Sequence, residues 1–475
     1  MLYTSFKFLL FFPIVCLFYF LFKKEKTRKI WLLISSYFFY MCWNPYYTLL
    51  LLFSTIVTYL SGTFISRYPK NKKVFLILSL VINIGILFFF KYSNFFIDNL
   101  NIIFSIFNVN LANHLDILLP IGISFYTFQA LSYTMDIYRG DVKEEKSFLD
   151  YALFVSFFPQ LVSGPIEKSK DFLPQLKIKH NFDYDRVKKG LLIMLVGFIY
   201  KMVVADRIAI AVNTVYGNLS NYSGIILFIT AILYSFQIYT DFYGYSLIAK
   251  GTAKVLGYEL YDNFDSPYLS KSIKEFWRRW HISLSTWFRD YLYFPLGGSR
   301  TSYIKKIRNI MIVFLVSGLW HGASWTFVIW GLLHGLYQVI GILTSKLREK
   351  ITFNNKILSS LKIVFTFLLV TFAWIFFRAS TFTDAIYVIT NSFKNFNLNL
   401  MSLGLDKYNL IFMFASVVLI VIFDILRLKV DLYRWLQERN IVIRWIIYFA
   451  LIWITLIFGI YGPGYSENTF IYIQF

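Results

Sequence analysis

Long blocks of apolar residues alternate with short polar segments along almost the whole chain. Many blocks are about 17 to 22 residues long, the length at which an α-helix crosses roughly 30 Å of hydrocarbon. Runs such as residues 74–90 lack the alternation of a barrel strand, and only helices or closed barrels satisfy their backbone in lipid. The pattern therefore predicts an all-α protein that crosses a membrane many times. The apolar stretches lie near residues 6–22, 30–43, 46–66, 74–90, 117–138, 148–163, 190–210, 224–247, 309–345 (long enough for two helices), 361–377, 408–424 and 444–461.

The composition agrees with a membrane protein, since 57% of the residues are hydrophobic and only 15% are charged. A soluble domain carries about 25% charged residues. The net charge of +21 could suggest nucleic acid, but Lys and Arg also gather in the cytoplasmic loops of membrane proteins and meet anionic head groups. We therefore expect contact with membrane lipid and no nucleic acid. The N-terminus lacks a basic start and a cleavage site, which indicates a retained first span.

The basic loops predict an orientation because positive charge accumulates on the cytoplasmic side. Basic clusters at residues 23–29, 67–73 and 164–189 are expected inside, which places the N-terminus outside. Alternation after the last apolar stretch leaves the tail, residues 462–475, outside as well. We expect one membrane-embedded domain over residues 1–475, with this tail on the extracytoplasmic face.

Two segments do not fit simple alternation. Residues 148–163 are apolar but lie between two basic loops, so they should enter and leave on one face, with Pro159 in the turn. Residues 272–300 have the same basic flanks. Irregular backbone at membrane depth is tolerated only beside protein or a water-filled cavity. The sequence therefore predicts a cavity that opens from the cytoplasm.

Polar residues at membrane depth often mark a site, and they concentrate in residues 236–300 and 317–334. His321 lies in an apolar, helical stretch between Trp320 and Gly322. A neutral imidazole can accept a proton at one nitrogen and donate one from the other. The alternative is a helix-to-helix hydrogen bond without a role in catalysis.

His281 stands in the run WRRWHISLSTW, beside Trp277. A belt of Trp and Arg at the membrane interface would explain the neighbours but not the histidine. Asp241 is a carboxylate within an aromatic-rich span and needs a partner there, either a histidine that it orients or an arginine. We expect His334 to be structural and to lie near the far interface.

Other chemistries are weakly supported. The chain has no Walker-type loop, no CxxC, no HExxH and no GxSxG, and its two cysteines lie in apolar runs. We therefore predict no metal, no disulfide framework and no hydrolase-type serine.

The blocks DFYGYSLIAKGTAKVLGYELYDNFDSPYLSKSIKEFWRRWHISLSTWFRDYLYFPLGGSR and SGLWHGASWTFVIWGLLHG resemble the signature of the membrane-bound O-acyltransferase (MBOAT) family, in its bacterial alginate and peptidoglycan O-acetylation branch. Residues 121–140 and 157–168 match the same branch. The resemblance implies about eleven transmembrane helices plus re-entrant helices around a central tunnel. It places His321 at the family's essential histidine and His281 at the second. Supporting positions in or beside the tunnel would be Asp241, Trp277, Trp320 and Gly322.

The resemblance also implies the substrates. A cytoplasmic thioester, acetyl-CoA or an acyl-carrier protein, would donate the acyl group as a substrate, with no bound cofactor. An extracytoplasmic, esterase-like acetyltransferase partner would complete transfer to an envelope polysaccharide. Basic residues could hold the donor's phosphates, although orientation by positive charge explains them equally well. These residues are Arg278, Arg279, Arg300, Lys305 and Lys306.

The chain ends in F-x-Y-x-x-F, which resembles the end of a small partner peptide in teichoic-acid D-alanylation systems. The phenol of Tyr472 could relay the acyl group, or the terminus could simply dock by hydrophobic contact.

The leading hypothesis is an O-acyltransferase of the bacterial cytoplasmic membrane that moves acetyl groups toward an envelope polysaccharide, with His321 as general base. One alternative is D-alanyl transfer to teichoic acid. Another is a transporter or lipid flippase, but we find no symmetric halves with matching broken helices. A scaffold that only recruits secreted enzymes would not need the two histidines.

Overall fold

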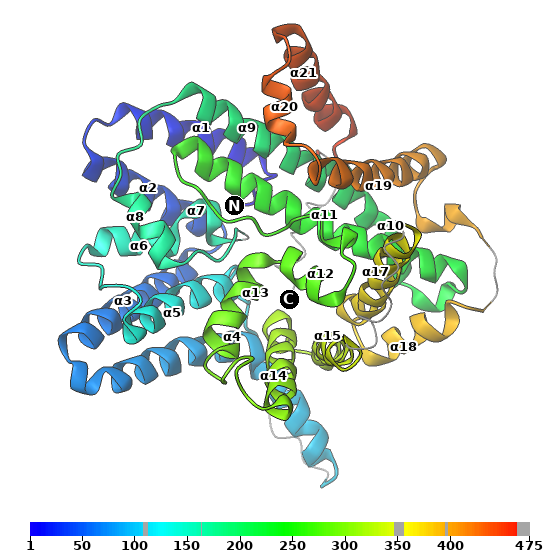
Figure 1. The fold of residues 1–475 in the computed structure, drawn as a ribbon, viewed down its shortest axis with the longest axis horizontal. Helices are drawn as coiled ribbons and strands as arrows, with labels where there is room; N and C mark the ends of the chain where they lie inside the picture. The colour runs from blue at the N-terminus through cyan, green and yellow to red at the C-terminus, as the bar shows by residue number, and fades with distance from the viewer. Residues whose placement is uncertain (108–112, 163, 346–355, 395–397, 463–475) are drawn as a thin grey trace. The chain divides into compact units, whose positions relative to one another are not determined.

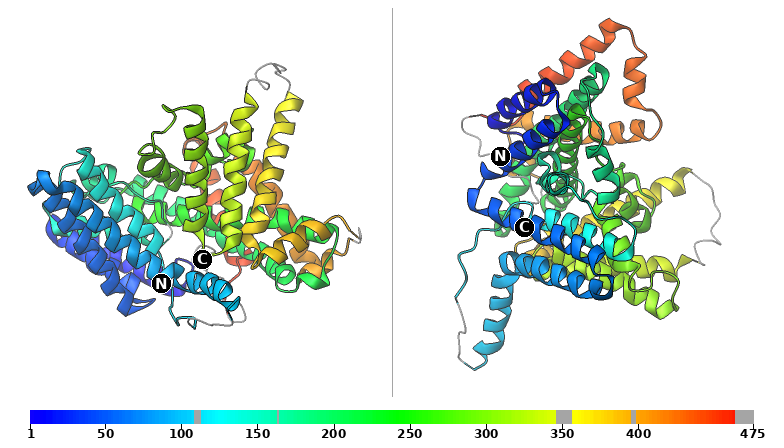
Figure 2. Two further views of the ribbon diagram at one scale, coloured as in Figure 1. Left: turned by 90° about the horizontal axis from the view of Figure 1, so that it is seen from below. Right: turned by 90° about the vertical axis from the view of Figure 1, so that its left-hand side faces the viewer.

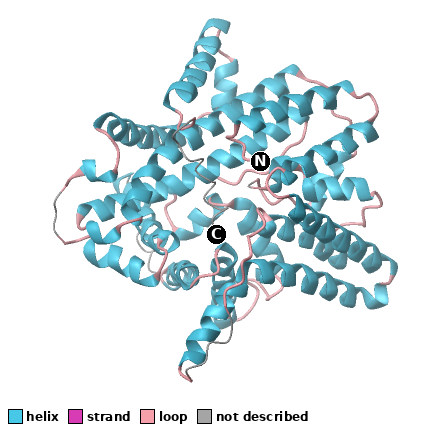
Figure 3. Cartoon of the chain, turned by 180° about the vertical axis from the view of Figure 1, so that it is seen from behind, coloured by secondary structure: helices cyan, strands magenta, loops and turns pink. Residues whose placement is uncertain are grey.

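The computed structural model describes the chain except residues 108–112, 163, 346–355, 395–397 and 463–475. The described residues form helices and loops and contain no strand (Figure 3). The predicted all-α architecture is confirmed, and the chain is a multi-pass membrane protein. Within the described residues, seven helices are long and apolar enough to cross a membrane, so the finer expectation of about eleven spans remains a prediction. The seven are Pro45–Arg67, Pro69–Ser105, Ile225–Leu256, Trp325–Leu343, Lys356–Arg378, Lys407–Arg427 and Ile441–Phe458.

The chain divides into two compact units, each of which is continuous in space but not in sequence. Unit 1 comprises Met1–Leu191 and Ala249–Tyr261, and unit 2 comprises Leu192–Ile248 and Asp262–Phe475. The chain passes between them within α9 (Tyr184–Phe198), within α11 (Ile225–Leu256) and after Tyr261 (Figure 1).

Unit 1 contains the N-terminal helices and the first of the two segments that the sequence marked as irregular. Residues 148–161 form two short helices, α6 and α7, separated by a break at Phe157. Both are far shorter than the roughly 20 residues that a span needs, and nearly all of their residues are buried in protein. The stretch is therefore interrupted as a re-entrant segment would be, and its entry and exit on one face of the membrane stay a prediction. The helices of unit 1 are α1 (Phe6–Leu21), α2 (Glu25–Met41), α3 (Pro45–Arg67), α4 (Lys72–Ser105), α5 (Ile123–Arg139), α6 (Phe148–Ser156), α7 (Phe158–Leu161) and α8 (Ser169–Leu176).

The loop after α7 contains a buried carboxylate, that of Glu167. The Glu167 carboxylate accepts a hydrogen bond of 2.7 Å from the backbone N–H of Tyr261, which ties this loop to the segment after α11. Burial raises the pKa of Glu167 to about 8.

Unit 2 contains the second irregular segment and the polar blocks. Residues 272–300 form two helices of one or two turns, α12 and α13, followed by a π-helical turn. The predicted interruption is again confirmed. The stretch 309–345 forms the expected pair of helices, α14 and α15, which lie side by side with α17 (Figure 2). The elements are the π-helical η2 (Ile199–Ala205), α10 (Asp206–Tyr216), α12 (Ile273–Arg279), α13 (Ile282–Phe288), the π-helical η5 (Arg289–Tyr293), α14 (Tyr303–His321), α15 (Trp325–Leu343), α17 (Lys356–Arg378), α18 (Phe382–Asn391), α19 (Lys407–Arg427), α20 (Leu432–Gln437) and α21 (Ile441–Phe458).

Glycines set the close approach of α14 and α15. A Cβ atom on Gly318 would lie 2.3 Å from the carbonyl oxygen of Phe327, and one on Gly331 would lie 2.3 Å from that of Phe314. Small residues let helix backbones approach closely inside membranes. The spacing of this hairpin therefore depends on the two glycines.

We expect Gly318→Ala to lower the thermal unfolding midpoint of the detergent-purified protein, because the added methyl meets backbone that cannot rotate away. Overpacking of this kind costs about 1–3 kcal/mol. Gly85→Ala in α4 is the matched control, since a Cβ there has open space within 4 Å and alanine favours helix. Equal midpoints for the two variants would contradict the close-packing account.

Candidate active site

His321 is the last residue of α14, and Gly322 leaves the helix with extended backbone (φ −159°, ψ 149°). The expectation that His321 lies in a helical stretch is therefore confirmed, and the structure adds that the helix ends there. A Cβ on Gly322 would lie 2.2 Å from the ring of Phe327, so only glycine allows the chain to turn here. Ser324 then caps α15 by accepting from the N–H of Thr326. This tight turn fixes the imidazole at the end of the hairpin.

The His321 side chain is enclosed by aromatic rings and is 3% exposed. Its ring centroid lies 4.9 Å from that of Trp320, 5.0 Å from Trp330 and 5.3 Å from Phe377, each in an edge-to-face arrangement. His281 is the next imidazole, at 6.4 Å. The structure thus brings together the two histidines that the sequence singled out.

His281 lies between α12 and α13 in a left-handed backbone conformation (φ 42°, ψ 55°). Non-glycine residues rarely adopt this region, and they do so most often at functional sites. The side chain is fully buried and packs edge-on against Phe242 of α11, with the centroids 4.7 Å apart. The backbone turn at His281 therefore directs an imidazole toward the end of α14.

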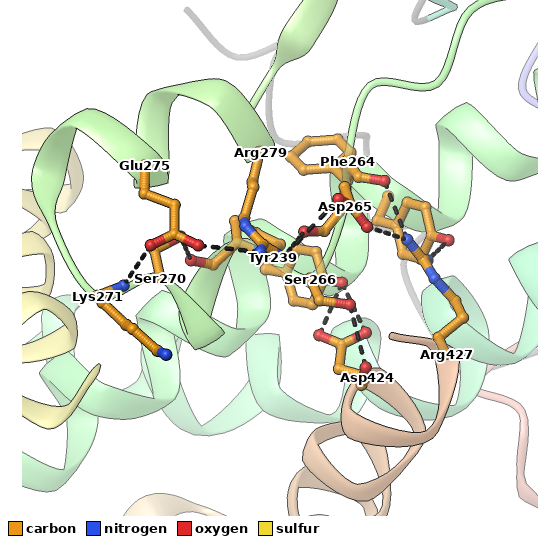
Figure 4. A network of polar contacts seen from close by, with 12 residues as sticks. Tyr239, Phe264, Asp265, Ser266, Ser270, Lys271, Glu275, Arg279, Asp424 and Arg427 are labelled. Atoms are coloured by element: carbon orange, nitrogen blue, oxygen red, sulfur yellow. Dashed lines mark hydrogen bonds and ion pairs between the residues drawn. The ribbon is translucent and has the colours of Figure 1, made fainter. Parts of the chain in front are cut away.

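A network of polar contacts holds the helix that precedes His281 (Figure 4). Arg279 makes an ion pair of 2.9 Å with Glu275 and donates to the backbone carbonyl of Asp265 at 3.2 Å. The N–H of Asp265 returns a bond of 3.0 Å to the carbonyl of Arg279. Arg427, at the end of α19, donates to the carbonyl of Phe264 at 3.2 Å. Arg279 is thus a member of this network. It does not line the cavity that is described below.

The same network reaches two long helices (Figure 4). The hydroxyl of Tyr239, on α11, donates to the carboxylate of Asp424, on α19, at 3.0 Å. Ser266 donates to the backbone carbonyl of Asp424 at 3.3 Å. The loop before α12 is therefore anchored to both helices.

Asp241 has a different partner from the two that we expected. Its carboxylate lies 2.8 Å from the ammonium of Lys201, which lies 2.8 Å from Asp206 as well. All three side chains are buried. Asp241 thus belongs to a buried ion triad with Lys201 and Asp206, a partnership that we did not expect.

Trp277 and His334 form a hydrogen-bonded pair within the aromatic core. The Trp277 indole N–H donates to Nδ1 of His334 at 3.2 Å, and the His334 ring is stacked against Phe276. His334 is fully buried and lies halfway along α15. Its expected place near the far interface is wrong, whereas the structural role remains consistent with these contacts.

A cavity of about 440 Å³ lies beside the histidines, between α12, α13, η5 and α14. Its wall is basic and hydroxylic as well as apolar. The lining includes Ile282, which follows His281, and Ser317, one helical turn before His321, but neither imidazole. Trp277 and Arg278 are the expected site residues that line it. The full lining is Lys274, Trp277, Arg278, Ile282, Leu284, Ser285, Thr286, Phe288, Arg289, Val313, Phe314 and Ser317.

The remaining predicted residues lie elsewhere. Arg300 precedes α14, while Lys305 and Lys306 lie in its first turn, and none of the three lines the cavity. Tyr472 falls outside the described residues. In the described part of the chain no three His, Cys, Asp or Glu side chains converge as a metal would require.

Sequence reasoning missed several residues of this site. Lys274 and Arg289 line the cavity, and Lys201 pairs with Asp241. A lone lysine within the apolar stretch 190–210 was a usable signal for the last of these, because a buried charge demands a partner. Nothing local in the sequence distinguishes Arg278, on the cavity, from Arg279.

Together, the apolar helices, the paired buried histidines and the basic cavity define a multi-pass membrane protein with polar groups buried in its interior. The chain belongs to the membrane-bound O-acyltransferase family, whose family model matches residues 142–382. It is therefore a membrane-bound enzyme that transfers acyl groups to oxygen.

Several relatives share most of their length with this chain. A peptidoglycan O-acetyltransferase of Helicobacter pylori is 38% identical over 395 residues, which cover 77% of this chain and 74% of the relative. The probable alginate O-acetylase AlgI of Pseudomonas aeruginosa is 40% identical over 373 residues, 78% of this chain and 70% of the relative. A teichoic acid D-alanyltransferase of Bacillus subtilis is 32% identical over 282 residues, 55% of this chain and 69% of the relative.

Proposed function

We propose that this enzyme moves an acetyl group from a cytoplasmic thioester across the bacterial cytoplasmic membrane toward an envelope polysaccharide, with His321 as general base. The supporting observation is the pair of buried imidazoles, 6.4 Å apart, near a basic cavity that Ile282, next to His281, and Ser317, one turn before His321, both line. Relatives named for O-acetylation cover more of this chain than the D-alanyltransferase does, which favours acetyl over D-alanyl. Membership of an acyltransferase family sets aside the transporter and scaffold alternatives.

In this proposal, an acceptor hydroxyl attacks the thioester carbonyl while His321 takes the hydroxyl proton. The carbon–sulfur bond breaks as the ester bond forms, and the imidazolium returns the proton to the departing thiolate. Such general base catalysis contributes roughly 10²–10⁴-fold to the rate. The aromatic enclosure of His321 keeps water from hydrolysing the thioester.

The cavity is the proposed site for the donor. Lys274, Arg278 and Arg289 supply three positive charges on its wall, and guanidinium groups suit phosphate oxygens. The donor would thus be anionic, as acetyl-CoA or an acyl-carrier prosthetic group is, and the cavity would open to the cytoplasm. Both termini would then be extracytoplasmic, where a separate acetyltransferase-like partner would receive the acetyl group.

The function is tested by deleting the gene and measuring the ester groups that mild alkali releases from the cell envelope. We expect acetate to fall in the deletion strain and to return when the intact gene is supplied. Loss of D-alanine instead of acetate would support the teichoic acid alternative, and unchanged release of both would refute the proposal.

We expect Arg278→Ala to raise the KM for acetyl-CoA by about tenfold with little change in kcat, because a charge-assisted contact contributes about 1.5–3 kcal/mol. The measurement is incorporation of labelled acetyl groups into inside-out membrane vesicles. Arg300→Ala is the control, since Arg300 does not line the cavity. An equal rise in KM for both variants would show that the cavity does not select the donor.

A further inference from the structure

Asn263 is a buried residue in the loop between α11 and α12, 2% exposed, that the chemistry above does not use. Its loop runs beside the residues that flank His281. The N–H of Ile282 donates to the Asn263 backbone carbonyl at 3.0 Å, and the N–H of Asp265 donates to the carbonyl of Arg279 at 3.0 Å. His281 therefore lies between two backbone bonds to a single loop.

The Asn263 side chain adds a second layer of contacts. Its Oδ1 accepts from the hydroxyl of Ser283 at 2.7 Å and lies 3.4 Å from the backbone N–H of the same serine. Its Nδ2 donates to the hydroxyl of Ser246, on α11, at 3.3 Å. One amide thus joins the first turn of the helix after His281 to α11.

Helix α11 also carries the aromatic ring against which His281 packs. Phe242 lies one turn before Ser246 on α11, and its centroid is 4.7 Å from that of His281. Asn263 therefore connects the turn at His281 to α11, the same helix that carries the Phe242 ring against which His281 packs.

The backbone at His281 requires such restraint. Among the described residues, His281 and Ser266 are the non-glycine residues with positive φ, at 42° and 46°. They lie on the two segments that the backbone bonds join. Conformations of this kind persist only where surrounding contacts over-determine them.

We infer that Asn263 is a positioning residue, which holds the strained turn at His281 so that this imidazole faces His321. The expected loss of activity rests on the proposed function. The expected displacement of His281 does not. It predicts that loss of the Asn263 side chain displaces His281 while the fold is retained.

The test uses Asn263→Ala in the full-length protein, with two readouts. The first is the NMR signal of His281 in protein made with isotope-labelled histidine, where the chain's five histidines are assigned by single substitutions. The second is acetyl incorporation from acetyl-CoA into inside-out vesicles. We expect the His281 signal to shift, the His114 signal to stay, and kcat to fall about 10- to 100-fold at unchanged KM, because His281 lies beside the proposed base and small displacements within an active site are that costly.

Asn83→Ala is the matched control. Asn83 is also buried, 1% exposed, and its amide accepts from Ser54 and donates to the carbonyl of Ser79, but it lies in unit 1 on α4. We expect this variant to lose thermal stability without a change in the His281 signal or in kcat.

Partial variants keep the inference testable if Asn263→Ala does not accumulate. Ser283→Ala and Ser246→Ala each remove one side-chain bond of Asn263, so each should shift the His281 signal and lower kcat by less. An unshifted His281 signal in folded variants overturns the inference, as does an unchanged kcat. If the intact protein transfers no acetyl group, the proposed function fails, and the NMR signal alone then decides whether Asn263 positions His281.

Discussion

Replacement of His321 by alanine is expected to reduce envelope O-acetylation by about 10²–10⁴-fold, to the background of a deletion strain, at a normal level of membrane-inserted protein. The imidazole lies on α14 one turn beyond Ser317, which lines the cavity, and it is packed by three aromatic rings. Alanine removes the proton acceptor but leaves the helix end intact, because Gly322 makes the turn.

The measurement is acetate released by mild alkali from the envelope of a complemented strain, with the amount of protein determined by immunoblot. His114→Ala is the control, since this histidine is an exposed partner of Asp98 in unit 1. His321→Gln would show whether a polar side chain without proton-accepting capacity restores anything. Wild-type acetylation by His321→Ala would exclude the imidazole as general base and would require another group for that role.

Much of the fold could be predicted because hydropathy reports directly on membrane depth. The helix pair in 309–345 and the interruptions at 148–163 and 272–300 were all expected, and α14, α15 and the short helices confirm them. The number of spans stays a prediction, but the way in which α9, η2 and α10 follow one another through the apolar stretch 190–210 was not expected. A π-helical insertion has no signal in hydropathy.

The end of α14 at His321 was also missed, for a different reason. An isolated glycine is compatible with a helix interior, so Gly322 alone does not predict a break. The break follows from the ring of Phe327, which leaves no room for a Cβ at Gly322 and comes from the next helix. Only tertiary packing supplies that information.

The identity of the candidate site residues could be predicted better than the contacts that each of them makes. His281 and His321 were recognisable from their motifs, and the structure brings their rings within 6.4 Å. The neighbours Arg278 and Arg279 were equivalent in sequence, yet one lines the cavity and the other pairs with Glu275. Successive side chains on a helix point about 100° apart, so Arg278 and Arg279 face different surroundings. Which of them faces the cavity depends on how α12 packs against its neighbours.

The buried triad of Lys201, Asp206 and Asp241 leads to the second large prediction. We expect Lys201→Met to lower stability by about 3–5 kcal/mol, so that the protein fails to accumulate or unfolds at a much lower temperature. Both carboxylates lie 2.8 Å from the ammonium, and none of the three side chains is more than 8% exposed. Removal of the lysine therefore leaves two like charges together, away from water.

The strongest evidence for this charge effect would be a second variant that recovers the stability lost in Lys201→Met. Lys201→Met combined with Asp206→Asn and Asp241→Asn removes all three charges at nearly constant volume, and it should regain most of the thermal unfolding midpoint because no uncompensated charge remains. Arg434→Met, which breaks an exposed pair with Glu438, should change stability by only about 0–1 kcal/mol. If the triple variant were as unstable as Lys201→Met alone, shape rather than charge would explain the loss. If it were stable but inactive, the triad would serve the active site through α11, the helix that carries both Asp241 and the Phe242 ring against His281.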